Sequence, residues 1–541
     1  MAKLVQSIKH GQSSRKICKR ASFALVFVEL CFALLIGRLF WIQCIDGEKL
    51  KHEAERYHQR TISIQPRRGA IYDRNHTSLA ISTKAYSLFG DPKLIKEPES
   101  VALSLSSIIE QPKDDILRKL EKDTRFVWLR RQLPDSKVDK VRLLNIEGLN
   151  FREEGRRFYP QNELASHIIG FVGIDDIGLE GIEKKYDAYM RRTTSMVSIK
   201  KDCKGRDLEP NNSSYNRPDP GYDLTLTLDT VIQSIVEREL QLACDQWKAK
   251  GGSVIVMDPR TGEILAMANC PTYDLNKAFH VNSDCKRNRA LIDLYEPGST
   301  FKIITASAAI NENIVNTKDT VKIAKELGSK KLYEYIKAFG LGDKTGVDTS
   351  ETCGFIRNIK QWTDRSIRFI PYGQGIAVNA LQMLSALNAI ANDGVIMRPF
   401  IVKKVTDGQE TILENMPCES KSPISAKTAT IMKEILQGVV ENGTGQSAKV
   451  EGYSAAGKTG TSQKVSEDGK GYISGKYTSS FVGFLPADKP IISIIVVIDE
   501  PQGQYHGGIV ASPVFKEIAS QIMQYLTISK GVCIVKTRPT S

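Results

Sequence analysis

The stretch "LYEPGSTFKIITASAAI", residues 294–310, places Ser299 three positions before Lys302 and directly after a Pro-Gly pair. Serine is a favoured N-cap residue, so the stretch is compatible with an ordinary start of an apolar helix. In a helix, however, the two side chains lie one turn apart on the same face. A serine hydroxyl becomes a nucleophile when a base removes its proton, and a lysine serves as that base when burial or a helix N-terminus lowers its pKa. The stretch therefore predicts either a capped helix or a nucleophile with its base.

The S-x-x-K spacing alone does not decide between these interpretations. It occurs four times in the chain, beginning at Ser13, Ser198, Ser283 and Ser299. Only the surroundings of Ser299 can distinguish it from the other three. Pro297 and Gly298 bring the chain into a tight helix entry, and an apolar helix follows. This context fits the burial and the positive potential of a helix N-terminus that lower the pKa of a lysine base.

A second half-site lies near the other end of the chain. The segment "SAAGKTGTSQK" contains Lys458, Thr459, Gly460 and Thr461. A cation and hydroxyl groups there can hold a substrate carboxylate, the glycine lets a substrate lie along a strand edge, and a backbone N–H can face an oxyanion. K-T-G also occurs at residues 344–346, so this motif is weak when it stands alone.

Length and composition limit the possible functions. The 541 residues exceed the size at which one hydrophobic core keeps growing, so two or more domains are expected. The formal net charge is +13, but the basic residues form no aromatic-interleaved patch and no nucleic-acid recognition motif accompanies them. The seven histidines are scattered, and the ten cysteines include no CxxC pair. We expect no nucleic acid, no metal ion and no cofactor. Seven cysteines follow residue 44, an odd number that leaves at least one free or intermolecular thiol outside the cytoplasm, and the sequence assigns no pairs among them.

The N-terminus predicts a membrane anchor. Residues 1–20 carry six Lys and Arg residues and no acid, and residues 21–42 are long and apolar enough to cross a bilayer. Basic residues remain on the cytoplasmic side, so the remaining chain is expected outside the cytoplasm, held at the cytoplasmic (inner) membrane. No small-x-small cleavage site follows the apolar run, which favours an uncleaved anchor over a signal peptide. Glu29 within the span hints at association inside the membrane.

Beyond the anchor, the pattern predicts two regions and a short tail. Residues 45–222 are mixed and end in the Asn-, Ser- and Pro-rich "DLEPNNSSYNRPDPGYD", which is the best linker candidate. Residues 223–530 begin with a strand, a helix at 231–247 and a strand pair at 251–269, and close with strands at 477–487 and 490–501 and a helix at 512–526. Strand pairs at both ends with helices between them predict an α+β domain whose sheet is completed by both termini. Residues 531–541 form a tail.

Several motifs in order resemble the class B penicillin-binding proteins along nearly the full chain. "RRGAIYDRNHTSLAIS" (residues 67–82) is similar to the family signature RG-x-I-x-DRNG-x-x-LA, with His76 where glycine is usual. "RRFYPQNELASHIIGFVG" (156–173) and "GLEGIEKKYD" (178–187) follow it. The second half contains "EPGSTFK" (296–302), the landmark "YIKAFGLGDKTGVD" (335–348), "YGQGIAVNALQMLSALNAIANDG" (372–394) and "GKTGTS" (457–462).

The resemblance implies a fold and a chemistry. The fold would be an N-terminal transmembrane helix, an extended pedestal (dimerisation) domain, and a serine β-lactamase-like transpeptidase domain with an antiparallel sheet flanked by helices. Ser299 would be the acyl-enzyme nucleophile and Lys302 its general base. Lys458, Thr459 and Gly460 would form the substrate-carboxylate strand, and the backbone N–H groups of Ser299 and Thr461 the oxyanion hole. K-T-G at 344–346 falls in the landmark and is interpreted as structural.

The implied activity is a D,D-transpeptidase that cross-links peptidoglycan stem peptides and is acylated by β-lactams. The pedestal opening "LAISTKAYSLFGDPKLI" (79–95) is closer to the division-type than to the elongation-type branch. That branch implies septal wall synthesis, with a polytopic membrane glycan polymerase and other division proteins as partners. A β-lactamase or carboxypeptidase would account for the serine chemistry but not for the long pedestal.

The sequence departs from the family at its third motif, S-x-N, whose serine relays protons and whose asparagine binds the substrate amide. Only 36 residues separate Lys302 from Phe339, fewer than such enzymes normally have, and the aligned positions around Asn316 and Thr317 contain no serine. The one literal S-x-N begins at Ser214, in the linker. Either Asn316 or Thr317 substitutes in part, or the segment has been lost and the chain is a catalytically impaired scaffold of the division complex.

Overall fold

A computed structural model of the protein describes residues 2–64, 66–192, 195–200, 220–314, 320–466 and 471–530. The chain divides into two compact units, one made of residues 1–66 and 193–218, and the other of residues 67–192 and 219–541. The boundary expected between residues 222 and 223 stays a prediction. The expected linker lies largely outside the described residues.

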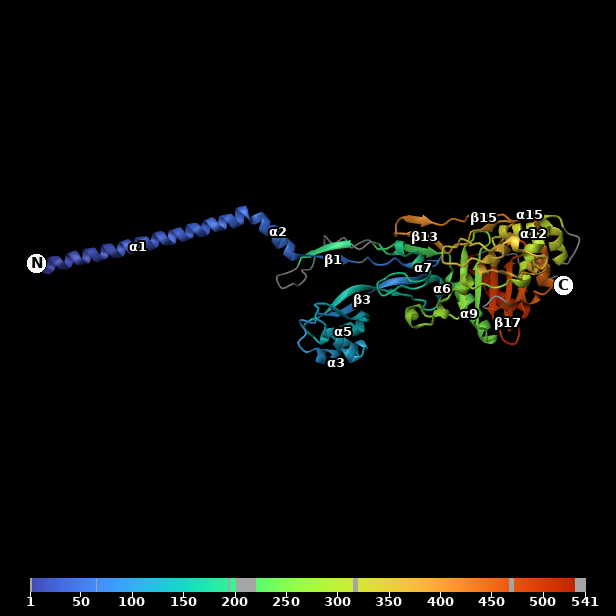
Figure 1. Cartoon of the computed structure of the whole chain (residues 1–541), viewed down its shortest axis with the longest axis horizontal. Helices are drawn as coiled ribbons and strands as arrows, with labels where there is room; N and C mark the ends of the chain where they lie inside the picture. The colour runs from blue at the N-terminus through green and yellow to red at the C-terminus, as the bar shows by residue number, and fades with distance from the viewer. Residues whose placement is uncertain are drawn as a thin grey trace. The chain divides into compact units, whose positions relative to one another are not determined.

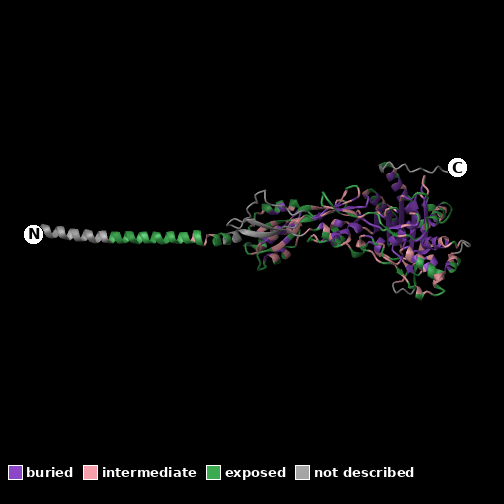
Figure 2. Cartoon of the chain, turned by 90° about the horizontal axis from the view of Figure 1, so that it is seen from above, coloured by how far each residue is buried: buried purple, intermediate pink, exposed green. Residues whose placement is uncertain are grey.

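The N-terminal unit contains the predicted anchor. Its elements are α1 (Ala2–Phe40), the π-helical turn η1 (Trp41–Ile45), α2 (Gly47–His58), and β1 (Gln59–Ile64) paired antiparallel with β6 (Ser195–Lys200). Among the described residues, one segment, Arg20–Ile45, is helical, long and apolar enough to cross a membrane. Residues 20–40 are exposed throughout, as Figure 2 shows in green along this helix. An exposed apolar helix of this length supports a single-pass membrane anchor.

The larger unit contains a mixed sheet that joins residues far apart in the chain. The strand order is β14-β13-β7-β2-β3-β4, with β5 also paired to β3. Its strands are β2 (Ile71–Tyr72), β3 (Ser78–Gly90), β4 (Val127–Leu133), β5 (Leu149–Phe158), β7 (Asp223–Leu226), β13 (Val402–Thr406) and β14 (Thr411–Glu414). β2 and β7 pair in parallel, so the strand that opens the second predicted region is hydrogen-bonded to the first signature of the pedestal.

Three helices pack at the far end of β3. They are α3 (Pro98–Ile109), α4 (Lys113–Leu120) and α5 (Asp135–Leu143), and Figure 1 shows α3 and α5 gathered there. Leu88 of β3 and Leu129 of β4 contribute to their common core, together with Leu105 and Ile116 from the helices. The amphipathic helices therefore close over one face of the strands and form a separate small core.

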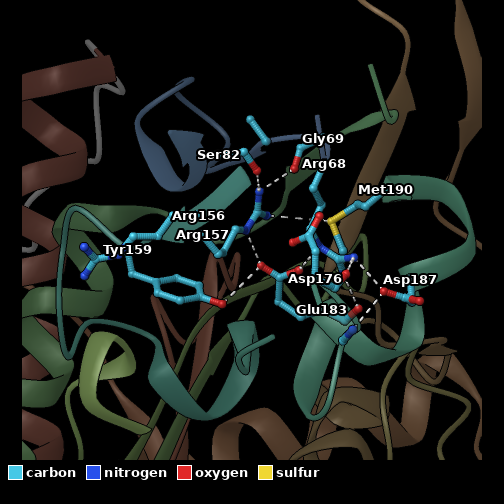
Figure 3. Close-up of polar contacts among 12 residues, drawn as sticks. Arg68, Gly69, Ser82, Arg156, Arg157, Tyr159, Asp176, Glu183, Asp187 and Met190 are labelled. Carbon is cyan, nitrogen blue, oxygen red and sulfur yellow. Dashed lines mark hydrogen bonds and ion pairs between the residues drawn. The ribbon is translucent and has the colours of Figure 1, made fainter. Parts of the chain in front are cut away.

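The three pedestal motifs converge on one buried carboxylate, Glu183 (Figure 3). Arg68 from the first motif donates through Nε to Glu183 Oε2 at 2.6 Å, and Arg157 from the second donates through Nε to Oε1 at 2.7 Å. Arg68 also pairs with Asp187 at 2.6 Å, and Glu183 itself is completely buried. We refer to Arg68, Arg157, Glu183 and Asp187 as the buried ion cluster. Because a buried charge is tolerated only when it is paired, the cluster holds the three motifs in one arrangement.

The second sheet of this unit has five antiparallel strands in the order β16-β17-β18-β8-β9. Its strands are β8 (Gly251–Met257), β9 (Ile264–Cys270), β16 (Ala456–Val465), β17 (Tyr472–Leu485) and β18 (Ile492–Asp499). β18 pairs with β8, so the early and late strand pairs form one sheet, and Figure 1 shows the late strands in orange and red. This confirms the predicted α+β fold with an antiparallel sheet completed from both ends.

Helices cover both faces of this sheet. Val254 and Val256 of β8 pack with α9 (Thr230–Gln246) and α17 (Ser512–Lys530), whereas Ile255 between them packs in a core with α11 (Lys302–Asn311), α14 (Ala380–Ala391) and α15 (Ala426–Asn442). Alternate residues of a strand point to opposite faces, which explains why the strand reads as an uninterrupted apolar run. Buried residues are concentrated around this sheet in Figure 2.

The remaining described elements lie between and around these layers. They are α6 (Ser166–Ile169), α7 (Gly181–Lys185), α8 (Asp187–Met190), η2 (Leu275–His280), η3 (Ser283–Lys286), α10 (Arg289–Ile292), η4 (Gly298–Phe301), α12 (Thr320–Ala338), β10 (Phe355–Ile356), η5 (Ile359–Gln361), α13 (Ser366–Phe369), η6 (Ile370–Tyr372), β11 (Ile376–Ala377), β12 (Ile396–Met397), β15 (Glu419–Lys421), η7 (Gln446–Ala448) and α16 (Gly507–Val510).

Candidate active site

Ser299 lies inside the short helix η4, and Lys302 begins the apolar helix α11 that follows. The N-cap positions of these helices are Pro297 and Phe301, and neither end has a side-chain cap hydrogen bond. Ser299 is half-buried, and its hydroxyl forms no hydrogen bond with the residues that the structure describes. The serine is therefore not used as a helix cap, and its hydroxyl is available for other chemistry.

The turn of Ser299 is pressed against strand β16. Gly298 has φ +56°, and a Cβ added there would lie 2.7 Å from the carbonyl oxygen of Thr461. A Cβ added at Gly460 would lie 2.9 Å from the carbonyl oxygen of Pro297. Both positions require glycine, because any side chain would push the turn and the strand apart. The structure thus brings the two predicted half-sites into direct contact.

Lys458 points into the same region from β16. Its Nζ donates to the carbonyl and hydroxyl oxygens of Thr459, both at 3.2 Å, and to Thr444 Oγ1 at 3.4 Å. Burial, and then the neighbouring positive charge of Lys302, lower the pKa of Lys458 to about 8. Two lysines converging on one half-buried space create a positive potential beside Ser299, which suits a substrate anion.

Lys302 has an aromatic neighbour that the sequence did not reveal. Its Nζ lies 4.8 Å from the centre of the Tyr372 ring, a cation–π contact. The next residue, Gly373, accepts a 3.4 Å hydrogen bond from the backbone N–H of Gly298. Tyr372 and Gly373 open the block "YGQGIAVNA", which the sequence marks only as a family landmark. This block therefore contacts both the turn of Ser299 and the side chain of Lys302.

A second group missed by the sequence surrounds the carboxylate strand. The hydroxyls of Thr444 and Thr459 are 3.0 Å apart, and Thr461 Oγ1 accepts from the backbone N–H of Gly507 at 2.9 Å. Thr444 stands in "ENGTGQ", a segment with no recognisable motif, so no sequence signal could have identified it. These contacts orient the hydroxyls that the K-T-G-T motif offers to a ligand.

The duplicate S-x-x-K and K-T-G motifs have surroundings different from those of Ser299 and Lys458. Ser283 of the third S-x-x-K is exposed in η3. In the second K-T-G, Thr345 Oγ1 and the Gly346 N–H both donate to the carboxylate of Glu351 at 2.9 Å, forming a local turn. Asn316 and Thr317, the positions considered for the third motif, lie outside the described residues.

Strand β16 is an edge strand, because it ends the strand order and, among the strands that the structure describes, pairs with β17 alone. Its free edge can accept an extended peptide as an added strand. A cavity of about 740 Å³ continues beside its C-terminal half, lined among others by Gln463, Glu296, Tyr472 and Arg357. Its lining includes none of the predicted site residues, so the cavity lies beside β16 beyond Thr461.

Comparisons with known proteins agree with the two motif-bearing regions. The family model for the penicillin binding protein transpeptidase domain matches residues 252–323 and 320–520, and that for the Penicillin-binding Protein dimerisation domain matches residues 63–226. The two ranges of the transpeptidase match overlap at residues 320–323, between Lys302 and Phe339.

Curated relatives are similar over nearly the whole chain. Stage V sporulation protein D of Bacillus subtilis (strain 168) is 32% identical over 554 residues, covering 94% of this chain and 85% of that protein. Peptidoglycan D,D-transpeptidase FtsI of Escherichia coli (strain K12) is 31% identical over 545 residues, covering 92% and 90% respectively.

Solved structures show the same fold. Penicillin Binding Protein 2X from Streptococcus thermophilus superposes with a TM-score of 0.69 at 22% identity, covering 88% of this chain and 83% of that one. Penicillin binding protein 3 from Mycobacterium tuberculosis, complexed with aztreonam, superposes with a TM-score of 0.65 at 25% identity, covering 89% and 100%.

Proposed function

This chain belongs to the class B penicillin-binding proteins, and from that premise we propose that it is a peptidoglycan D,D-transpeptidase acting through an acyl-enzyme at Ser299. The family's transpeptidase domain and the names of the relatives support transpeptidase activity on peptidoglycan. The assignment of the serine rests on one observation above all: the glycine-only contact between the Ser299 turn and the strand of Lys458.

In the proposed mechanism, Ser299 Oγ attacks the penultimate D-Ala carbonyl of a stem peptide while Lys302 takes the hydroxyl proton. The developing oxyanion accepts hydrogen bonds from the backbone N–H groups of Ser299 and Thr461. Lys302 returns the proton to the departing terminal D-Ala, leaving an acyl–serine ester. An amine of a neighbouring stem peptide then attacks the ester, forming the cross-link and releasing Ser299. A β-lactam acylates the same oxygen by opening its ring.

Substrate binding is assigned to β16. The terminal carboxylate of the stem peptide would meet Lys458, Thr459 and Thr444, whose donors already converge there. The peptide backbone would add to the free edge of β16.

We expect acylation by a carboxylate-bearing β-lactam to slow as the pH rises through about 8, the pKa of Lys458. Below that pH the ammonium is charged and attracts the carboxylate; above it the charge is lost, well before an ordinary lysine would lose it. Second-order acylation rates measured between about pH 6 and pH 10 test this expectation. Lys458→Arg keeps its charge over that range and should lack the decline. An identical decline in Lys458→Arg would contradict the assignment.

Membrane placement and partners extend the proposal. The basic tail supports an N-terminus inside the cytoplasm and a catalytic unit outside it. We place the protein in septal wall synthesis, with a polytopic glycan polymerase and other division proteins as partners reached through anchor and pedestal. The support is the division-type sequence at residues 79–95.

A second candidate function is a penicillin-binding scaffold that no longer turns over. It is favoured by the shortened segment between Lys302 and Phe339, where the two ranges of the family match overlap and no S-x-N serine is present. Without that serine, proton transfer to the leaving group has no relay. Acylation by a strained lactam demands less of the site than release of D-Ala, so such a protein would still bind penicillin.

One assay separates the two candidates. The purified full-length protein is incubated with a stem-peptide donor ending in D-Ala-D-Ala and an amine acceptor, and both free D-Ala and the cross-linked product are measured. We expect both products, and their loss in Ser299→Ala. A penicillin adduct without D-Ala release would instead establish the scaffold, and release that persists in Ser299→Ala would refute the serine mechanism.

A further inference from the structure

Two buried cysteines meet in the core beneath the second sheet. Cys244 lies near the end of α9 and Cys270 at the end of β9, 26 positions later in the chain. They are 4% and 8% exposed, and both belong to the core formed by α9, α17 and the sheet. Helix α9 packs directly on β9, so residues distant in sequence become neighbours.

The contacts place the two sulfur atoms in one pocket. Both cysteines are free thiols in the structure, and Cys270 Sγ donates to Gln241 Oε1 at 3.5 Å. Gly252 stands opposite Cys270 in the β8–β9 ladder, and a Cβ added to it would lie 3.2 Å from Cys244 Sγ. Directly opposed residues share a face of the sheet, so Cys270 and the glycine both face Cys244. The missing side chain at Gly252 leaves room for the helix cysteine to approach.

The thiolate is the attacking form in thiol–disulfide exchange. The other described cysteines beyond the anchor, Cys285, Cys353 and Cys418, show no thiol–thiol contact with described residues, and the latter two are exposed.

We propose that Cys244 and Cys270 are joined by a disulfide bond that fastens α9 to β9. This inference rests on the proposed placement of the larger unit outside the cytoplasm, where disulfides form and persist. The oxidant is the disulfide of a thiol–disulfide exchange protein. The thiolate of one cysteine attacks it and releases one thiol; the other cysteine then attacks the protein sulfur of the mixed disulfide and releases the second. The pair loses two electrons and two protons, and the oxidant becomes a dithiol.

Burial sets the time at which the bond forms. In the folded unit neither sulfur is open to an exchange protein, so closure must precede the packing of α9 on β9. The bond closes a loop that contains β8 and the turn to β9, and so restricts the unfolded chain around the β8–β9 end of the sheet. It would stabilise the sheet that carries the proposed carboxylate strand without touching the site itself.

The pairing is tested on full-length protein taken from its native membrane. Free thiols are alkylated under denaturing conditions without reductant, and the digested protein is analysed by mass spectrometry. We expect one peptide pair linked through Cys244 and Cys270. Two alkylated peptides in place of the linked pair would overturn the proposal.

Exposed Cys418 reports the membrane placement in the same sample. A membrane-impermeant maleimide added to cells with a permeabilised outer surface should label Cys418. Labelled Cys418 with a reduced Cys244–Cys270 pair refutes the disulfide and leaves the proposed placement standing. Unlabelled Cys418 with a reduced pair refutes the placement, and the disulfide with it.

Thermal unfolding provides the second measurement. Cys244→Ala/Cys270→Ala should lower the unfolding midpoint by on the order of 5 °C and remove its sensitivity to a reductant. Cys418→Ala is the matched control and should keep both the midpoint and the reductant sensitivity. A wild-type midpoint that does not change on reduction would contradict the proposed bond, even if the double variant failed to fold.

Discussion

Replacement of Ser299 by alanine will abolish the covalent penicillin adduct, and replacement of Ser283 by alanine will leave it intact. Both serines stand three positions before a lysine, so local sequence does not distinguish them. Ser299 is pressed against β16 near the converging Lys302 and Lys458, whereas Ser283 is exposed in η3. Since the adduct is an ester of the serine oxygen, its removal should reduce labelling by roughly a thousandfold or more.

Fluorescent penicillin and denaturing electrophoresis measure this directly on the purified protein. The unfolding midpoint of Ser299→Ala should match that of the parent, because the Ser299 hydroxyl has no hydrogen bond with the described residues whose loss would destabilise the fold. Labelling that survives in Ser299→Ala, or that disappears equally in Ser283→Ala, would contradict the assignment of the nucleophile.

Replacement of Glu183 by glutamine will destabilise the larger unit by roughly 3–5 kcal/mol, the usual cost of breaking a buried ion pair. Glu183 is completely buried and pairs with both Arg68 and Arg157. Glutamine has nearly the same shape but no charge, so it leaves two buried guanidinium groups with too little compensation. The three pedestal motifs that meet at this residue should loosen together.

The control is Glu153→Gln, which removes a pair with Lys84 whose side chains are about half exposed. Exposed pairs contribute about 0–1 kcal/mol, so this variant should unfold like the parent. Urea titrations of the detergent-solubilised protein, followed by tryptophan fluorescence, compare the two. Equal midpoints for Glu183→Gln and Glu153→Gln would show that the buried ion cluster does not hold the motifs together.

Much of the fold could be predicted from hydrophobic pattern. Strand pairs with turn residues between them, and an apolar N-terminal segment, are local signals that tertiary structure rarely overrides. β8, β9 and β18 all form where the sequence predicts strands. The parallel pairing of β2 with β7 had no such signal, because it joins residues about 150 positions apart through short strands.

The site was predictable only as two unconnected halves. The motifs around Ser299 and Lys458 identify the side chains that carry charge and hydroxyls, because those are properties of residue types. The sequence did not predict Tyr372 or Thr444 as neighbours of the site. Their contacts with Lys302 and Lys458 depend on packing between distant segments rather than on spacing within a motif. The substitution of Asn316 or Thr317 for the third motif stays a prediction, because both residues lie outside the described residues.

The sequence by itself determined the order of the motifs, the anchor, the α+β class and the absence of an S-x-N serine after Lys302, because each of these is a matter of residue identity and local pattern. Tertiary structure alone showed that the turn of Ser299 contacts the strand of Lys458, and that Cys244 lies near Cys270. Contacts between distant segments arise when apolar faces pack into a common core, and their geometry depends on the whole sheet rather than on any one stretch.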